Sequence, residues 1–276
     1  MEIFAFLKYN FIVRAFIAGS FIGILCSLLG IFLVLRRLSL IGDGLAHVTF
    51  GSIAVGIFFR AQPMYVALPL VAFSSLGILK LSETANIYGD AAIGIVSSLG
   101  IATGILLVSF SGGLNTDIFG YLFGSILSVS ASETWISAVL SVAVIALICV
   151  LYQDLFSTTF DEEFARISGV KAVRINRVLV VVTGVTVVLA MKVVGIMLIS
   201  SLLILPAAAS LQVARSFKSA LFISAAVSVF SVVTGIIVSF YADFPAGASI
   251  VMANFCLFII AFFYKRVKCC LNHKNR

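Results

Sequence analysis

Long apolar segments separated by short polar or glycine-rich stretches run through the whole sequence. Each segment approaches the roughly 20 residues that an α-helix needs to cross the hydrocarbon core of a membrane. The pattern therefore predicts an all-α polytopic integral membrane protein with eight or nine transmembrane helices, forming a single transmembrane domain over residues 1–276. The predicted spans lie at about 13–35, 40–59, 63–80, 91–110, 133–152, 177–192, 193–214, 220–241 and 248–264.

Two places in this pattern need their own interpretation. Segments 177–192 and 193–214 leave very few residues for a turn near Lys192, so eight spans are the alternative to nine. Segment 117–130, DIFGYLFGSILSVS, lies between two loops on the same side of the membrane, which predicts a half-helix or a re-entrant segment. Such a segment must be buried in protein or line a cavity, because lipid cannot satisfy the backbone groups at its broken end.

The stretch 153–176 carries charges of both signs in an otherwise apolar chain. It predicts a short amphipathic cytoplasmic helix near 160–170 that lies along the membrane, with Gly169 as its stop. A partner docking on this helix would explain it, and an ordinary solvated loop helix is the alternative. The expected cap is Ser157, Thr158 or Thr159, the first-turn acids are Asp161, Glu162 and Glu163, and the apolar face is Phe160, Phe164 and Ile167.

Composition supports the membrane interpretation. Hydrophobic residues make up 62% of the chain, charged residues 11%, and the mean hydropathy is +1.23, values that no soluble domain has. The net charge of +7 reflects positive residues retained in cytoplasmic loops rather than an affinity for nucleic acid. Because positive residues gather at 36–37, at 166–177 and after residue 264, we expect the N-terminus outside and the C-terminus in the cytoplasm.

Asp43 and His47 are the strongest candidates for chemistry. Ionisable residues inside a membrane are costly and therefore candidates for function, and this pair is expected in the middle of the second span. Their spacing of four residues places both side chains on one face of a helix. A carboxylate and a neutral imidazole suit Zn²⁺, and Mn²⁺ or Fe²⁺ nearly as well. The alternatives are a helix cap for Asp43 and a packing role for His47.

Three further charged residues have open interpretations. Asp90 lies near the start of the fourth span, where a helix cap and a place in the ion path are both plausible. Lys192 lies at an external bend and is expected to extend its amine to the membrane surface. Asp243 belongs to an external turn with Pro245 and Gly247, so it either forms the turn or faces an incoming delivery protein.

Several sequence motifs of enzymes do not occur. The chain has no GxxxxGK[ST] phosphate loop, so ATP hydrolysis by that route must reside on a partner chain. It also has no HExxH, GxSxG or cysteine-rich zinc motif. We therefore expect a non-enzymatic protein that draws its energy from a partner or from an ion gradient.

Five segments together resemble the metal-type permeases of ABC importers, the group that includes bacterial zinc, manganese and iron uptake permeases. They extend over most of the chain, and FPAGASIV (244–251) adds a sixth. The five are LRRLSLIGDGLAHVTFGSIAVG (35–56), GDAAIGIVSS (89–98), TDIFGYLFGSILSVS (116–130), FDEEFARISGVKAVRINRVL (160–179) and AMKVVGIMLISSLLILPAAASLQVARSF (190–217).

The resemblance implies a bacterial inner-membrane permease subunit with defined partners. It makes the helix at 160–170 a coupling helix for a cytoplasmic ABC ATPase subunit. It also implies a second permease copy, a metal-binding protein on the external face near Asp243, and no cofactor other than the transported ion. The residues expected at the ATPase contact are Asp161, Glu162, Glu163, Phe164, Ala165 and Gly169.

The resemblance favours zinc as the transported ion, with Mn²⁺ or Fe²⁺ as the alternatives. GDGLAH, AMKVVG and FYADFPAG are similar to segments of zinc permeases, although Ser125 stands where such permeases often carry an acid. The resemblance also supports Asp43 and His47 as residues of the ion path. A secondary transporter in which Asp43 and Asp90 titrate is the competing hypothesis, and an intramembrane enzyme is a remote third.

Overall fold

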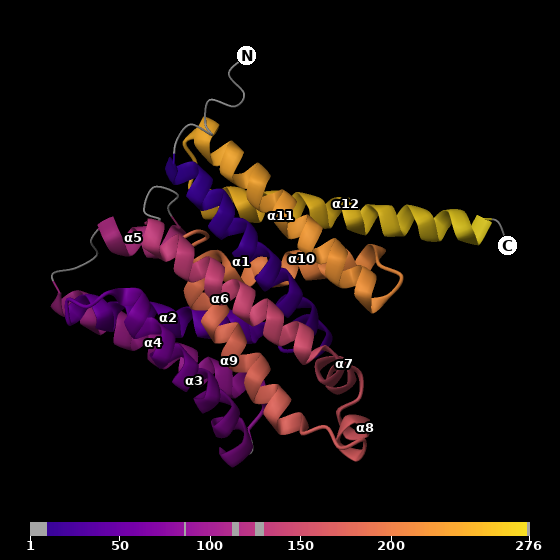
Figure 1. Cartoon of the computed structure of the whole chain (residues 1–276), viewed down its shortest axis with the longest axis horizontal. Coiled ribbons are helices and arrows are strands. Elements are labelled where there is room, and N and C mark those ends of the chain that lie inside the picture. Colours follow the sequence, from indigo (N-terminus) through magenta and orange to yellow (C-terminus); the bar gives the residue numbers. More distant parts are fainter. Residues whose placement is uncertain (1–9, 86, 112–115, 125–129, 275–276) are drawn as a thin grey trace.

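The computed structural model describes residues 10–85, 87–111, 116–124 and 130–274, and every regular element in this part of the chain is a helix (Figure 1). Within these residues, nine helices are long and apolar enough to cross a membrane, which confirms the all-α membrane fold and favours nine spans over eight. The elements are α1 (Asn10–Leu35), α2 (Leu40–Phe58), α3 (Pro63–Ala85), α4 (Gly89–Phe110), α5 (Thr116–Phe123), α6 (Ala131–Val150), α7 (Tyr152–Phe160), α8 (Glu162–Ile167), α9 (Ala172–Ala190), the 3₁₀ helix η3 (Ile196–Leu198), α10 (Ile199–Val213), α11 (Phe217–Ala242) and α12 (Ala246–Lys274).

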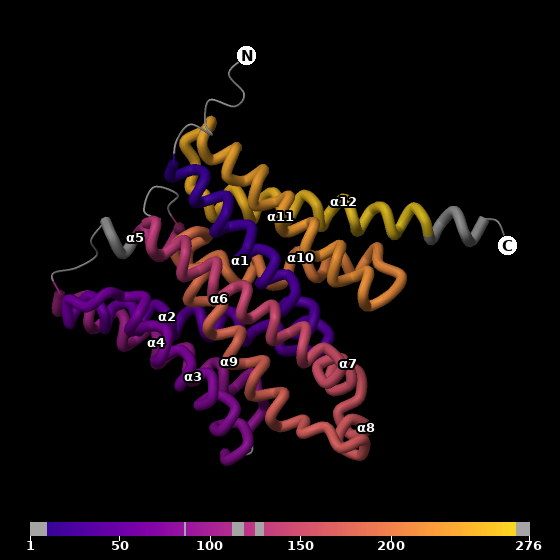
Figure 2. Tube along the Cα trace, in the orientation of Figure 1, coloured from indigo at the N-terminus to yellow at the C-terminus, as the bar shows by residue number. Residues whose placement is uncertain are grey.

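Helices α1 and α2 form the interior of the bundle. In the most apolar stretch of each, 67% of the residues are buried, against 22% in α4. Figure 2 shows α1 running through the bundle, where it packs against α6, α10 and α11. An α-helix that is apolar on all sides can be buried on all sides, and the sequences of α1 and α2 have little amphipathic character.

Helices α2 and α4 approach each other through glycine. A Cβ atom at Gly51 of α2 would lie 2.5 Å from the carbonyl oxygen of Gly100 of α4, and Gly44 faces Ile93 in the same way. Small residues let helix backbones approach closely, which is the usual basis of helix association in membranes. The contacts advance in the same direction along both helices, so α2 and α4 run parallel and begin at the same end of the molecule.

The predicted half-helix is present as α5. Its eight residues rise only about 12 Å, too little to cross a membrane. It ends at Gly124, whose φ of +76° favours glycine. Part of the predicted segment, including Ser125, lies outside the described residues. Helix α6 then begins with Ser130 as its cap, in a capping box with Glu133.

The turn between α9 and α10 resolves the crowded region at 177–214. Helix α9 ends at Ala190, and η3 starts after Gly195, whose φ is +88°. A Cβ atom at Gly195 would lie 2.4 Å from the carbonyl carbon of Phe123, so this turn packs directly on the end of α5. Glycine therefore makes both the reversal and the contact possible.

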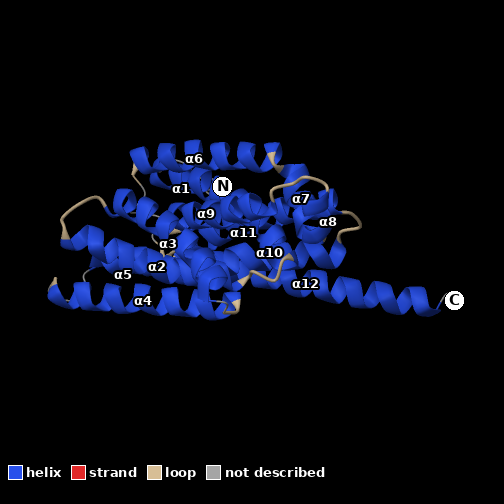
Figure 3. Cartoon of the chain, turned by 90° about the horizontal axis from the view of Figure 1, so that it is seen from below, coloured by secondary structure: helices blue, strands red, loops and turns tan. Residues whose placement is uncertain are grey.

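Helix α12 extends further than the sequence indicated. The predicted span ended at residue 264, but the helix continues through the basic residues to Lys274. Its C-terminal part projects beyond the other helices (Figures 1 and 3). The helix therefore continues past the end of its apolar stretch.

Candidate functional site

Asp43 and His47 share one face of α2, as their spacing indicated. Asp43 Oδ2 lies 3.6 Å from His47 Nε2, and the two side chains are 52% and 27% exposed. Asp43 is not the cap of the helix, because α2 begins at Leu40 with Ser39 in the cap position. The pair was expected in the middle of the span. It lies instead near the start of α2, which begins at Leu40.

The same face of α2 becomes apolar beyond His47. Phe50 and Ala54 follow at helical spacing, and they pack with Val108 of α4 and Leu122 of α5. Gly42 and Gly44, on the sides of this face, receive Leu203 and Ile93 from neighbouring helices rather than leaving open space. The polar pair therefore lies at one end of a face that is closed by apolar packing toward its other end.

Asp90 is the second residue of α4 and lies at the same end of the bundle as Asp43, because α2 and α4 run parallel. It is exposed, and it is not the helix cap, which is Tyr88. A carboxylate in the first turn is favoured by the helix dipole. Among the described residues, no third His, Cys, Asp or Glu joins Asp43 and His47 in a metal-binding group.

The short helix predicted near 160–170 is present as α8, and a second short helix, α7, precedes it and is separated from it at Asp161. Asp161 has an extended backbone, and its Oδ1 accepts a hydrogen bond from Phe164 N at 2.9 Å, so it caps α8 itself. The expected cap at Ser157, Thr158 or Thr159 is wrong, because these residues belong to α7 and Thr158 and Thr159 bond their own helix.

The break also changes the apolar face. Phe160 belongs to α7, where its ring packs on Phe156 and Phe217, and it does not share a helix with Phe164. Phe164 and Ile167 of α8 are 63% and 85% exposed, whereas Ala165 is buried. Glu162 and Glu163 occupy the first turn as expected, and Gly169, with a φ of +89°, ends the segment.

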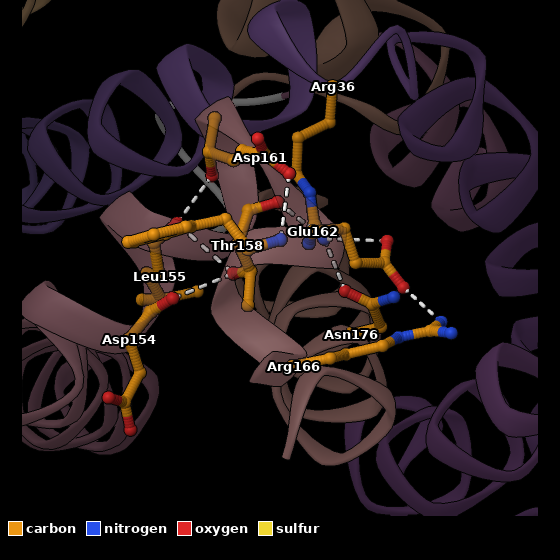
Figure 4. Close-up of polar contacts among 10 residues, drawn as sticks. Arg36, Asp154, Leu155, Thr158, Asp161, Glu162, Arg166 and Asn176 are labelled. Carbon is orange, nitrogen blue, oxygen red and sulfur yellow. Dashed lines mark hydrogen bonds and ion pairs between the residues drawn. The ribbon is translucent and has the colours of Figure 1, made fainter. Parts of the chain in front are cut away.

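Arg36, which the sequence suggested only as a positive charge, joins this segment to the α1–α2 turn (Figure 4). Its guanidinium lies 3.7 Å from Glu162, donates to Thr158 O at 3.3 Å and makes a close hydrogen bond to Asn176 Oδ1. Burial lowers the pKa of Arg36 from its ordinary value, and Glu162 opposes that shift. A polar Asn at the start of a membrane helix was the one sequence signal for this contact.

Lys192 does not extend to the surface as expected. Its Nζ lies 2.7 Å from Oε1 of Glu133, both side chains are largely buried, and the ring of Tyr121 lies 5.2 Å from the amine. Burial is the largest single influence on the pKa of Lys192 and lowers it, but the hydrogen bonds and charges of Glu133 and Tyr121 together outweigh burial and raise the pKa above its ordinary value. This ion pair joins the start of α6 to the α9–α10 turn, next to α5.

Asp243 lies in the turn between α11 and α12, with a φ of +52° that is unusual outside glycine. It is exposed and lines a cavity of about 340 Å³ together with Phe11 of α1 and Phe244. The start of α1 and this turn therefore share one end of the molecule, away from α7 and α8 (Figure 1).

The part of the chain that the structure describes contains nine helices of membrane length, which defines a multi-pass membrane protein. Residues 8–265 match the ABC 3 transport family, and the chain belongs to that family. The match confirms the resemblance that the five sequence segments indicated.

Curated relatives and a solved structure match nearly the full length. The chain is 30% identical to the manganese transport system membrane protein MntC of Halalkalibacterium halodurans, covering 94% of this chain and 88% of MntC. It is 28% identical to the high-affinity zinc uptake system membrane protein ZnuB of Haemophilus influenzae, covering 92% and 98%. PsaBC from Streptococcus pneumoniae in complex with Fab aligns with a TM-score of 0.81 and 31% identity, covering 93% of this chain and 92% of that chain.

Proposed function

We propose that this chain is the permease subunit of an ABC importer that carries a divalent transition metal into the bacterial cytoplasm. Family membership over residues 8–265 supports this proposal, as do relatives named for manganese and for zinc transport. Because relatives with either name are similarly close, the proposal covers Zn²⁺ and Mn²⁺ equally, with Fe²⁺ as a third candidate. The preference for zinc that the sequence segments favoured is not carried further.

The geometry of Asp43 and His47 is the observation that carries the proposal. Two metal–ligand bonds of about 2.1 Å that meet at a tetrahedral or slightly wider angle hold their donor atoms roughly 3.5 Å apart. The separation of 3.6 Å between Asp43 Oδ2 and His47 Nε2 matches this value without movement of either side chain. Two protein ligands, completed by water, bind a passing ion weakly enough to release it.

The two ends of the molecule supply surfaces for the proposed partners. At one end α8 exposes Phe164 and Ile167, which we propose enter a groove on the ATPase subunit together with Glu163. At the other end the turn at Asp243 is the proposed contact for the metal-binding protein. A second permease copy would complete the transporter, and closure of the two ATPase subunits would change the access of Asp43 and His47 from one side to the other.

Reconstituted transport tests the proposal. Proteoliposomes that contain this chain, its ATPase subunit and the metal-binding protein should take up radioactive Mn²⁺ or Zn²⁺ when ATP is supplied. Asp43→Asn and His47→Gln should each reduce uptake by roughly 10- to 100-fold, since the loss of even an outer-sphere partner of a metal ligand has about that effect. Asp90→Asn, which changes a first-turn residue of α4, should leave uptake close to that of the unmodified chain.

Two results would contradict different parts of the proposal. Normal uptake by an Asp43→Ala, His47→Ala double variant would exclude these residues from the ion path while leaving the transporter class intact. Metal flux driven by a proton or sodium gradient, with this chain alone in the membrane, would instead support a secondary transporter.

A further inference from the structure

The guanidinium of Arg36 connects three separate parts of the cytoplasmic segment. Its ion pair reaches Glu162 at the start of α8, one hydrogen bond reaches the Thr158 carbonyl near the end of α7, and another reaches Asn176 in α9 (Figure 4). The side chain is 6% exposed, so these contacts are made away from bulk water. Arg36, a single residue of the α1–α2 turn, therefore contacts α7, α8 and α9.

The three contacts converge on one atom of the guanidinium, Nη2, which the planar group holds in a fixed orientation. A planar guanidinium offers five donors in a fixed arrangement and can serve several acceptors at once, whereas a lysine amine is a single point charge. Arg166 also bonds Glu162 from the next turn of α8, which fixes the orientation of the carboxylate between the two arginines. A movement of α8 therefore moves Glu162, and through it the guanidinium of Arg36.

The link from Arg36 to α2 is short and stiff. The turn that follows Arg36 is closed by backbone hydrogen bonds, from Leu38 N to Leu33 O at 2.8 Å and from Ile41 N to Leu38 O at 3.1 Å. Helix α2 begins at Leu40, and Asp43 lies in its first turn. A displacement of Arg36 is therefore transmitted to the start of α2, because the turn between them is short and closed by hydrogen bonds.

One donor of Arg36 is unsatisfied. Its Nη1 atom is buried and has no hydrogen-bond partner within the described residues. A buried donor without an acceptor is unfavourable. A rearrangement of the segment that gave Nη1 an acceptor would relieve this cost.

We propose that Arg36 is the positioning residue that couples α8 to the metal ligands, by transmitting movement of α8 through the α1–α2 turn to Asp43 and His47. The inference rests on the proposed function as an ATP-driven metal importer. It adds to that function the specific contact through which ATPase closure reaches the ion path. Arg36 itself touches neither the metal nor the ATPase in this scheme.

Reconstituted transporters that carry Arg36→Gln test the inference, with Arg37→Gln as a matched control. Arg37 is the neighbouring residue, it is exposed, and it carries the same charge. Uptake of Mn²⁺ and Zn²⁺ and hydrolysis of ATP are measured in the same vesicles, and copurification of the ATPase is measured beforehand. For Arg36→Gln, metal imported per ATP hydrolysed should fall roughly 10-fold, within the range of about 5- to 150-fold typical of coupling between sites.

The ATPase should still copurify with Arg36→Gln, and ATP should still be hydrolysed, because α8 keeps its exposed face. Arg36→Lys should fall between Arg36→Gln and the unmodified chain, and Arg37→Gln should match the unmodified chain. Import per ATP that stays within about twofold in Arg36→Gln would overturn the inference, since it lies below the range typical of coupling. A parallel loss of copurification, hydrolysis and melting temperature would also overturn it, because it would show a purely structural role.

A second pair of variants tests the inference independently of any substitution at Arg36. Glu162→Gln removes the ion pair with Arg36 and with Arg166, whereas Arg166→Gln removes only the second of these. Import per ATP should fall in Glu162→Gln and remain normal in Arg166→Gln, and equal values in the two would overturn the inference. Failure of the unmodified transporter to import either metal would instead contradict the proposed function, and the inference with it.

Discussion

Individual charged residues in this protein are stabilised by partners that lie far away in the sequence. Arg36 pairs with Glu162, and Lys192 pairs with Glu133. Each of these four residues lies in a turn or near the start of a helix. A charge removed from water is tolerated when a partner compensates for the lost hydration. Asp43 and His47, like Glu162 and Arg166, instead contact each other four residues apart on one helix, and they remain partly exposed.

The pair formed by Lys192 and Glu133 supports a prediction at the scale of the residue. Lys192→Met leaves the Glu133 carboxylate without its partner and should destabilise the protein by about 1.5–3 kcal/mol, the contribution of a hydrogen bond to a charged group. Glu133→Gln should have a similar effect. The measurement is the melting temperature of the protein in detergent, with Lys218→Met, at an exposed lysine, as the control.

A double variant separates pairing from other effects. Because either single substitution already breaks the ion pair, Lys192→Met with Glu133→Gln should cost less than the two single changes together. Strictly additive losses would show that the two side chains contribute independently. The pKa of Lys192 is raised in the folded protein, so its amine is charged at neutral pH. The stabilisation that the charged amine provides is therefore lost only as the pH rises above 10.5, the ordinary pKa of lysine.

At the scale of the element, α8 is a short helix that is not one of the membrane-length helices and that nevertheless has an exposed apolar side. It contains six residues, too few to be stable alone, and it is held by the Asp161 cap and the Glu162 contacts. Phe164 and Ile167 nevertheless stay exposed. A short helix that is fixed from within and apolar on its outside is suited to docking.

We predict that Phe164→Ala and Ile167→Ala weaken binding of the ATPase subunit. Truncation of a central apolar side chain at an interface costs about 2 kcal/mol or more, which corresponds to roughly 30-fold in affinity. Copurification of the ATPase with the tagged permease measures the effect. Lys171→Ala, at an exposed position in the same loop, should leave the yield unchanged, and unchanged copurification in Phe164→Ala would contradict the proposed docking surface.

Charge reversal sharpens the same prediction. Glu163→Lys changes an exposed carboxylate and should weaken docking without disturbing the permease. Glu162→Lys is less informative, because Glu162 also holds Arg36 and Arg166. If Glu163→Lys left ATPase binding unchanged, the acidic first turn of α8 would have no part in the contact.

At the scale of the whole molecule, an odd number of spans would place the two ends of the chain on opposite sides of the membrane. With the α7–α8 segment in the cytoplasm, all of the eighteen Lys and Arg residues except Lys8, Arg14, Arg60 and Lys192 lie on the cytoplasmic side. That distribution agrees with the retention of positive loops in the cytoplasm. It supports an external N-terminus and a cytoplasmic C-terminus.

Reporter fusions test this orientation. Green fluorescent protein joined after Arg276 should fluoresce, because it folds in the cytoplasm, and alkaline phosphatase at the same position should be inactive. Phosphatase inserted after Gln62, in the turn between α2 and α3, should be active and serves as the control. An active phosphatase after Arg276 would contradict the orientation and would place α8 on the wrong side for an ATPase.

The amino-acid sequence was sufficient for the features that depend on local pattern. The positions of most spans follow from runs of apolar residues, although the choice between eight and nine did not, and the shared face of Asp43 and His47 follows from helical periodicity. The half-helix before α6 followed from the parity of the loops. These are properties of short stretches of chain, so neighbours in the fold change them little.

Packing between distant segments decided the rest. The parallel approach of α2 and α4 through Gly51 and Gly100 brings Asp90 to the end that Asp43 occupies. The partners of Arg36 and Lys192 likewise depend on which helices meet. A residue's own sequence neighbourhood does not carry that information, because the energy of a contact depends on both partners and on the backbone that brings them together.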